Sequence, residues 1–95
     1  MEKKYKKVLL NIIKKYLPNS KVYLFGSRAT KKHREGSDID LAIDNEKSLE
    51  LKTIFRIQNE IEKTSIPLFV DIVDLNTASE NLKNEIKKEG ILWKN

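Results

Sequence analysis

Residues 38–43 alternate between polar or small side chains and branched apolar ones, which is the period of a β-strand with one buried face. One face carries Asp38, Asp40 and Ala42, and the other carries Ile39, Leu41 and Ile43. At a rise of about 3.3 Å per residue, the two carboxylates lie roughly 6.6 Å apart and repel each other unless a counter-charge is present. Either both are solvated surface charges, or they hold a cation such as Mg²⁺, which readily takes carboxylate oxygens.

A second feature lies just upstream, where the apolar run 22–25 stops at Gly26-Ser27. A strand that ends in glycine and leads into a helical turn presents backbone N–H groups to an anion. Glycine lets a phosphate approach the main chain, while the Ser27 hydroxyl and the Arg28 guanidinium add hydrogen bonds. Alone, a Gly-Ser pair is an ordinary turn and a D-x-D motif is more often surface than site. Their conjunction favours phosphoryl or nucleotidyl transfer.

A third carboxylate is available in the sequence VDIVD at 70–74, which offers Asp71 and Asp74. Residues three apart in a strand face opposite sides, so both cannot join one site. Asp71 lies among apolar residues, where an unpaired charge is costly, whereas Asp74 ends the strand and has an ordinary structural use there. We therefore expect Asp71 to complete the site, which requires the fold to bring two strands side by side.

Apolar spacing places the remaining elements of the first half. An amphipathic helix is predicted over 5–17, ended by Pro18 and Asn19. A strand follows over 21–25, then a helical turn after Ser27 and a basic loop to Gly36.

The second half repeats this alternation of helix and strand. Asp44-Asn45 offers a helix cap, and one face of that helix is marked by Leu51, Ile54, Phe55, Gln58 and Ile61. A strand is predicted over 68–75, after Pro67. Thr77 and Glu80 form a capping box for a last helix that ends at Gly90. Residues 91–93 suit a short edge strand, in which Trp93 is interpreted as a packing residue.

This order of elements predicts an α/β (α+β) fold, with helices covering a single small mixed β-sheet. We expect residues 1–95 to form one domain. No run approaches the roughly 20 apolar residues of a membrane span, and the N-terminus lacks the apolar core of an export signal. A cytoplasmic location is therefore expected. The absence of cysteine excludes disulfides and thiolate metal sites.

The net charge of +5 suggests a nucleic-acid partner, yet lysines are spread along every segment without aromatic interleaving. The cluster KKYKK at 3–7 is interpreted as a solvated helix face. The cluster KKHR at 31–34 lies beside the Gly-Ser turn, where cations help attract a polyphosphate. His33 is interpreted as a solvated loop residue. Direct nucleic-acid binding is therefore not expected.

The motifs LFGSRAT and GSDIDLAI, followed by VDIVDL, closely resemble those of the minimal nucleotidyltransferases (MNT) of the DNA polymerase β superfamily. These small proteins are often paired with a HEPN-domain partner. The resemblance spans residues 21–75 by motif and the whole chain by element order, and it implies a polymerase β-like nucleotidyltransferase fold. It assigns nucleotide binding to Gly26, Ser27, Arg28 and Ser37, and metal binding and catalysis to Asp38, Asp40 and Asp71. Many relatives continue Ala-Arg-Gly where this chain reads Ala29-Thr30-Lys31, which leaves the role of that arginine unfilled.

The resemblance implies transfer of AMP from ATP to a hydroxyl, assisted by two Mg²⁺ ions, with release of pyrophosphate. In MNT/HEPN pairs the nucleotidyltransferase is the antitoxin and modifies a tyrosine of the HEPN toxin. Ninety-five residues leave no room for the helical domain that larger relatives use to hold the acceptor. The acceptor must then bind a partner chain or a second copy of this chain, or be a protein itself. The alternative is a catalytically silent module that neutralises a HEPN partner by binding alone.

Overall fold

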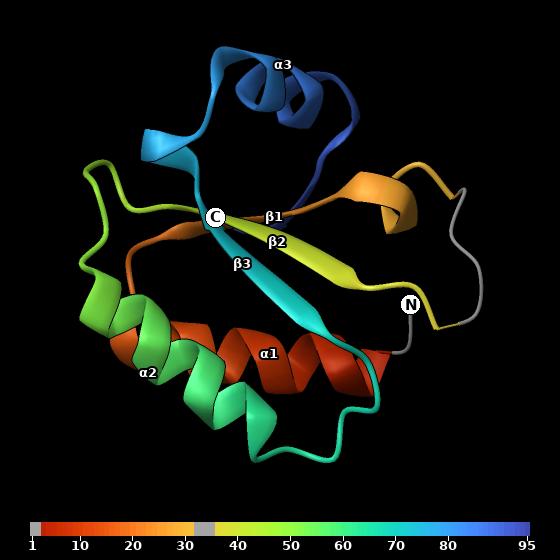
Figure 1. Ribbon diagram of the computed structural model, residues 1–95, viewed down its shortest axis with the longest axis vertical. Coiled ribbons are helices and arrows are strands. Elements are labelled where there is room, and N and C mark those ends of the chain that lie inside the picture. The colour runs from red at the N-terminus through yellow and green to blue at the C-terminus, as the bar shows by residue number, and fades with distance from the viewer. Residues whose placement is uncertain (1–2, 32–35) are drawn as a thin grey trace.

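The computed structural model describes residues 3–31 and 36–95, in which helices and strands alternate along the chain (Figure 1). The helices are α1 (Lys3–Tyr16), α2 (Leu51–Glu62) and α3 (Glu80–Glu89), with short 3-10 turns η1 (Gly26–Arg28) and η2 (Leu75–Thr77). The strands are β1 (Lys21–Phe25), β2 (Ile39–Asp44), β3 (Val70–Asp74) and β4 (Ile91–Lys94). None of the helices in these two ranges is long and apolar enough to cross a membrane.

Within the described residues, the strands form one mixed four-stranded sheet in the order β3-β2-β1-β4. β1 runs antiparallel to both β2 and β4, whereas β2 and β3 are parallel. A parallel pair requires a crossover connection, and α2 provides it. The predicted small mixed sheet is confirmed. Its register places Asp40 opposite Asp71, so the two strands that the site requires are neighbours.

The sheet has a helical layer on each side, with α1 and α2 on one face and α3 on the other (Figure 1). The larger core lies on the α1 and α2 side and contains Leu9, Ile13, Leu17, Val22, Leu24, Ile39, Leu41, Ile43, Ile57, Ile61, Val70 and Ile72. A smaller cluster of Phe25, Ala42 and Ile86 lies under α3. Because Ala42 is buried in it, β2 is covered on both faces in its second half.

The helix predicted over 5–17 is α1, and its buried face confirms the amphipathic pattern. Leu9 and Ile13 are fully buried, and Leu17 is buried just beyond the last helical residue. Ser20 is also buried, and its hydroxyl donates a hydrogen bond to the Leu17 carbonyl at 2.9 Å. This bond satisfies a carbonyl that the end of the helix leaves without a partner.

The predicted inner face of α2 was wrong in part, and its predicted cap was wrong. Ile61 is buried as predicted, together with Ile57, whereas Leu51 and Phe55 are 71% and 66% exposed. The residue at the N-cap position is Glu50 rather than the Asp44-Asn45 pair. Asp44 instead ends β2 and accepts a hydrogen bond from the Glu46 amide at 3.0 Å. Two apolar stripes are present at helical spacing on this segment, and packing against the sheet selects the one that contains Ile57.

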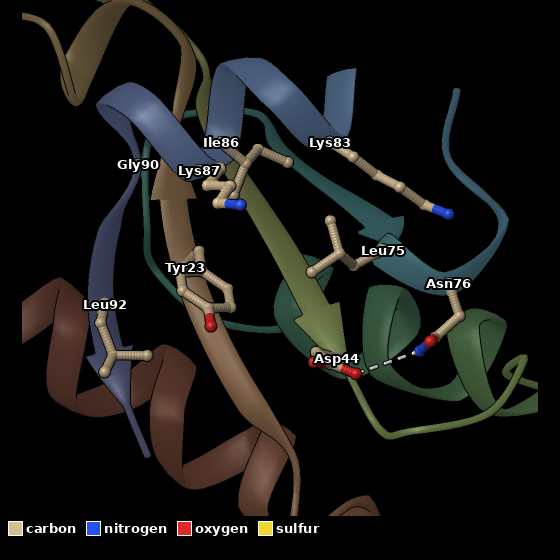
Figure 2. A pocket seen from close by; sticks show the side chains of 9 residues that line it. All are labelled: Tyr23, Asp44, Leu75, Asn76, Lys83, Ile86, Lys87, Gly90 and Leu92. Carbon is tan, nitrogen blue, oxygen red and sulfur yellow. Dashed lines mark hydrogen bonds between the residues drawn. The ribbon is translucent and has the colours of Figure 1, made fainter. Parts of the chain in front are cut away.

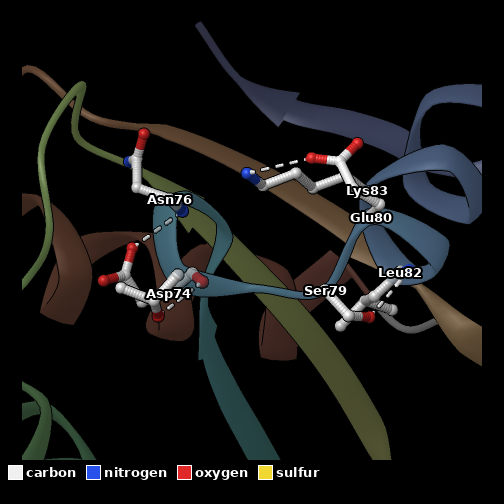
Figure 3. Close-up of polar contacts among 7 residues, drawn as sticks. Asp74, Asn76, Ser79, Glu80, Leu82 and Lys83 are labelled. Atoms are coloured by element: carbon white, nitrogen blue, oxygen red, sulfur yellow. Dashed lines mark hydrogen bonds and ion pairs between the residues drawn. The ribbon is translucent and has the colours of Figure 1, made fainter.

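The predicted cap of α3 was also wrong, because η2 intervenes between β3 and the helix. Thr77 belongs to η2, and Ser79 is the N-cap, with its side chain accepting from the Leu82 amide at 3.2 Å (Figure 3). Glu80 pairs with Lys83 on the helix surface at 3.9 Å. Gly90 ends the helix as expected, but by close approach to the Ile86 carbonyl and not by a left-handed turn.

Candidate active site

The Gly-Ser turn joins the end of β1 to the segment that leads towards β2. Gly26 has a φ of +76°, a left-handed conformation that favours glycine. The amides of Ala29 and Thr30 donate to the Gly26 carbonyl at 3.1 and 3.3 Å, and the Thr30 hydroxyl donates to the Ser27 carbonyl at 3.2 Å. These bonds fix a tight turn, η1. The first amides of such a turn have no carbonyl partner inside it, which suits an anion.

Glycine is required at position 26 for a second reason, which is contact with Asp40. A Cβ atom at position 26 would overlap the Asp40 carboxylate oxygen Oδ2. The contact follows from the antiparallel register, in which Phe25 lies opposite Asp40. The Gly-Ser turn and the Asp40 carboxylate are therefore in direct contact, as the conjunction of the two motifs requires.

Asp40 is the electrostatic centre of this region. It is half-buried, and its side chain lies on the same face as that of Ala42, towards α3. Burial raises the pKa of the Asp40 carboxyl above 3.8, and the negative charges of Asp71, Asp38 and Glu85 raise it further. Glu85 belongs to α3 and was not singled out in the sequence, since nothing local links it to β2. Asp40 is thus a carboxylate in need of a nearby positive charge.

The other two predicted metal ligands lie beside Asp40 but are more exposed. Asp71 lies opposite Asp40 on β3, which is an edge strand, and its side chain is exposed. The argument that Asp71 is costly because it is buried was therefore wrong. Asp38 is exposed and precedes β2, which begins at Ile39 and not at residue 38 as predicted.

The three aspartates offer only carboxylate oxygens as ligands, and Mg²⁺ prefers oxygen ligands. Asp40 already contacts the Gly-Ser turn, so a cation held by these carboxylates would supply positive charge beside that turn. Among residues 3–31 and 36–95, no group of three acidic or histidine side chains is already gathered as a cation site.

Arg28 and Ser37 connect the turn to the carboxylates. The Arg28 side chain donates from Nε and Nη2 to the Ser37 carbonyl at 3.1 and 2.9 Å. Ser37 immediately precedes Asp38, so this bidentate contact ties the turn to the start of the D-x-D motif. Lys31 has a φ of +61°, at the position where many members of the resembled family carry glycine. His33 lies outside the described residues.

Asp74 has the structural role that its place at the strand end predicts. Its carboxylate is buried and accepts a hydrogen bond from the Asn76 amide at 3.0 Å (Figure 3). It accepts a second one from the Leu49 amide at 2.9 Å. These bonds hold η2 and the approach to α2 against the end of β3. Asp74 is therefore not part of the carboxylate group around Asp40.

A cavity of about 480 Å³ lies on the α3 side of the sheet, near the opposite end of β2 from Asp40 (Figure 2). Its lining residues are Tyr23, Asp44, Leu75, Asn76, Lys83, Ile86, Lys87, Gly90 and Leu92. Asn76 donates to the Asp44 carboxylate at 3.2 Å across it. None of the seven predicted site residues lines this cavity, and the sequence pattern gave no sign of it.

Comparisons with known proteins agree with the family resemblance that the sequence motifs indicate. Residues 7–94 match the family described as polymerase beta, nucleotidyltransferase. A relative from Haemophilus influenzae with the name "Probable protein adenylyltransferase MntA" is 32% identical over 81 residues, which cover 85% of this chain and 71% of the relative.

Two solved structures share the fold. A toxin–antitoxin structure with AMP-PNP aligns with a TM-score of 0.79 and 24% identity, over 93% of this chain and 71% of the other. A Shewanella oneidensis complex of a tri-AMPylated HEPN toxin with its MNT antitoxin aligns with a TM-score of 0.76 and 22% identity, over 98% and 71%. The expected polymerase β-like fold is confirmed.

Proposed function

This chain belongs to the polymerase beta nucleotidyltransferase family, and we propose that it transfers AMP from ATP to a protein. The acceptor is a hydroxyl, a tyrosine side chain by preference, on a HEPN-domain toxin, and the transfer makes this protein the antitoxin. Residues 1–95 act as one catalytic domain in this proposal. Because the reaction consumes ATP, we place it in the cytoplasm.

The observation that carries the proposal is the position of the Asp40 carboxylate. It is half-buried, touches Gly26 of the phosphate-binding turn, and lies opposite a second carboxylate on β3. A sheet that only served a structural purpose would gain nothing from a half-buried carboxylate beside a second carboxylate that repels it. A site that receives a cation together with a nucleotide triphosphate uses both features.

Each residue has a defined task in the proposed transfer. The backbone amides of the turn and the Ser27 hydroxyl bind phosphate oxygens, and Arg28 and Ser37 hold the turn against the D-x-D motif. Asp38, Asp40 and Asp71 would hold Mg²⁺, which would supply positive charge to offset that of the phosphates.

The bond changes follow those of an in-line displacement. The acceptor hydroxyl oxygen forms a bond to the α-phosphorus, the bond from that phosphorus to the bridging oxygen breaks, and pyrophosphate leaves. Asp71 is exposed at the edge of the sheet, where it can accept the proton of an approaching hydroxyl.

Two relatives support the choice of nucleotide and partner. The Haemophilus influenzae relative carries the name of a protein adenylyltransferase, and the Shewanella oneidensis toxin in the MNT complex carries AMP groups. The structure with AMP-PNP contains an analogue of ATP. A HEPN reading frame beside the gene for this protein is expected on the same grounds.

The test is transfer of label from α-³²P-ATP to the product of that neighbouring reading frame, in the presence of Mg²⁺. Asp38→Ala and Asp40→Ala are expected to abolish labelling. Asp44→Ala is the matched control, because Asp44 lies on the same strand and face as Asp40 but at its other end. Labelling by the control and by the unmodified protein, but not by the two variants, supports the enzyme.

The alternative is a silent module that neutralises the toxin by binding alone. It predicts that Asp38→Ala and Asp40→Ala neutralise the toxin in cells as well as the unmodified protein does, without any labelling. That result would overturn the proposed transfer.

A further inference from the structure

An exposed phenylalanine lies beside the three aspartates, at the point where β3 begins. Phe69 is 61% exposed, and a single exposed apolar side chain is ordinary in itself. Its position is what distinguishes it. The Phe69 carbonyl accepts a hydrogen bond from the Ile39 amide at 2.9 Å, so the pairing of β3 with β2 extends one residue before Val70. Continued by that residue, the register sets Phe69 opposite Asp38.

The side chain of Phe69 is on the face of the sheet that carries the aspartates. Its neighbours Leu68 and Val70 both pack into the core on the α1 and α2 side. Val73, two residues beyond Asp71, packs under α3 instead. Because side chains alternate along a strand, Phe69 and Asp71 share the α3 face, about 6.6 Å apart along the chain.

The strand that carries Phe69 and Asp71 is at the edge of the sheet, where a partner can approach (Figure 1). Its outer side is nevertheless closed to a further strand by Gln58 of α2. The Gln58 side chain donates to the Val70 carbonyl at 3.1 Å and accepts from the Ile72 amide at 3.2 Å. An added strand would need these main-chain groups. A partner at this edge therefore binds through side chains, and Phe69 offers it an exposed ring.

The order of the strands determines the side from which an acceptor reaches the nucleotide. In the proposed function, the Gly-Ser turn at the end of β1 binds the phosphates that leave as pyrophosphate. An in-line displacement requires the attacking oxygen to lie opposite the leaving oxygen. Because β2 lies between β1 and β3, the acceptor hydroxyl approaches over β3. The nucleoside is attached to the α-phosphorus at an angle to this line, which leaves the face of β3 to the acceptor.

We propose that Phe69 binds the aromatic ring of the acceptor tyrosine and thereby selects tyrosine over serine and threonine. This proposal rests on the proposed function and deepens it, and the bonds made and broken are those of the proposed transfer. Two aromatic side chains pack with their ring centres about 4.5–7 Å apart. A phenol ring packed on Phe69 would therefore extend its hydroxyl towards Asp71, the carboxylate proposed to accept the proton. The short side chain of serine or threonine gains no such contact.

Phe55 provides a matched control for Phe69. It is similarly exposed, at 66%, but it belongs to α2, which covers the opposite face of the sheet from the aspartates. Phe55→Leu therefore removes an exposed aromatic ring of the same kind without changing the surroundings of Asp38 and Asp71.

The first test measures binding and needs no catalysis. The probes are AMP and two conjugates, in which AMP is joined to the phenol oxygen of N-acetyl-tyrosinamide or to the hydroxyl of N-acetyl-serinamide. Isothermal titration calorimetry with Mg²⁺ is expected to show the tyrosine conjugate as the tightest ligand. Phe69→Leu should weaken that conjugate by about two- to tenfold and leave the other two ligands unchanged, whereas Phe69→Tyr should retain its affinity.

Three results of this titration would overturn the proposal. The first is a tyrosine conjugate that binds no more tightly than the serine conjugate. The second is an equal weakening of AMP and the tyrosine conjugate in Phe69→Leu, because the ring then packs on adenine. The third is an equal effect of Phe55→Leu, because exposed apolar area in general then binds the acceptor.

The second test follows the transfer itself, as initial rates of labelling of the HEPN partner from α-³²P-ATP. Phe69→Leu is expected to lower kcat/KM for the partner by about two- to tenfold and to leave KM for ATP unchanged. Phe69→Tyr should restore the rate, and Phe55→Leu should resemble the unmodified protein. Full activity of Phe69→Leu, or a raised KM for ATP, contradicts the proposal.

The two tests separate this proposal from the one on which it rests. Absence of transfer by the unmodified protein refutes the proposed function, and the titration then decides whether Phe69 binds an aromatic ring. Transfer that proceeds equally well with and without the Phe69 ring leaves the proposed function standing and overturns this inference alone.

Discussion

Replacing Asp40 by asparagine is expected to raise the thermal stability of the metal-free protein while it abolishes nucleotidyl transfer. Burial raises the pKa of Asp40 above 3.8, and the carboxylates of Asp71, Asp38 and Glu85 raise it further. The folded state therefore holds the proton of the Asp40 carboxyl more tightly than the unfolded chain does. The free energy of unfolding then falls as the pH rises past 3.8, the ordinary pKa of this group. Asparagine keeps the shape of the side chain but carries no charge, so Asp40→Asn removes this loss of stability at neutral pH.

The size of the gain follows from the sheet register. Asp40 lies opposite Asp71 on a parallel neighbour, and neighbouring strands lie about 4.8 Å apart. At that distance two unit charges repel by about 0.9 kcal/mol in water and about 3.5 kcal/mol at an effective dielectric constant of 20. Because Asp71 is exposed, screening favours the lower end, and we expect about 1 kcal/mol. For a domain of this size, that raises Tm by about 4–8 °C.

The assay is thermal unfolding followed by circular dichroism, at low salt and without divalent ions. The difference between Asp40→Asn and the unmodified protein should be largest at pH 7 and should vanish well below pH 3.8, where the carboxyl is protonated in both states. Added Mg²⁺ should raise the Tm of the unmodified protein more than that of the variant.

Asp44→Asn is the control for this prediction. The Asp44 carboxylate accepts hydrogen bonds from the Glu46 amide and the Asn76 side chain, so its replacement should lower Tm or leave it unchanged. A Tm of Asp40→Asn equal to or below that of the unmodified protein at pH 7 would refute the reasoning. A gain that persists in acid would refute it as well.

Three further substitutions test other parts of the structure. Gly26→Ala is expected to destabilise the fold by about 1–2 kcal/mol in urea denaturation, because φ is positive and the new Cβ meets the Asp40 carboxylate; an unchanged midpoint would contradict this contact. Glu60→Gln should lower Tm at pH 7, since the hydrogen bond from Lys15 lowers the pKa of Glu60 below 4.5. That difference should fade as the pH falls through the lowered pKa and should shrink in high salt. Asp74→Ala should cost about 1–3 kcal/mol in the same urea assay, because two backbone amides lose their buried acceptor; a smaller loss would show that water replaces the carboxylate.

The local parts of the fold and of the site were predictable from the sequence. The alternation at 38–43 predicts β2 to within one residue at each end, because side chains in a strand have a period of two. Gly26 marks the end of β1 and adopts the left-handed conformation that glycine allows most easily. These features depend on neighbours in the chain, so the sequence contains them directly.

Features that depend on competing local signals were predicted less well. On α2 the apolar residues Leu51 and Phe55 fit a helical stripe as well as Ile57 does, and they are nevertheless exposed. Gln58 on this helix bonds the main chain of β3 at Val70, an interaction that only the packed structure reveals. Hydrophobicity alone cannot select one stripe when two are present, because the choice depends on the shape of the opposing sheet.

The sequence by itself determined which residues are equipped for phosphate and metal chemistry, since glycine, serine and aspartate carry that chemistry wherever they lie. Only the tertiary structure decided which of them meet. Parallel pairing of β2 with β3 brings Asp71 beside Asp40, and the antiparallel register with β1 presses that carboxylate against Gly26. The same packing brings Trp93 of β4 beside Lys6 of α1. Electrostatic coupling and stacking depend on distance in space, and strand register sets that distance across long separations in the chain.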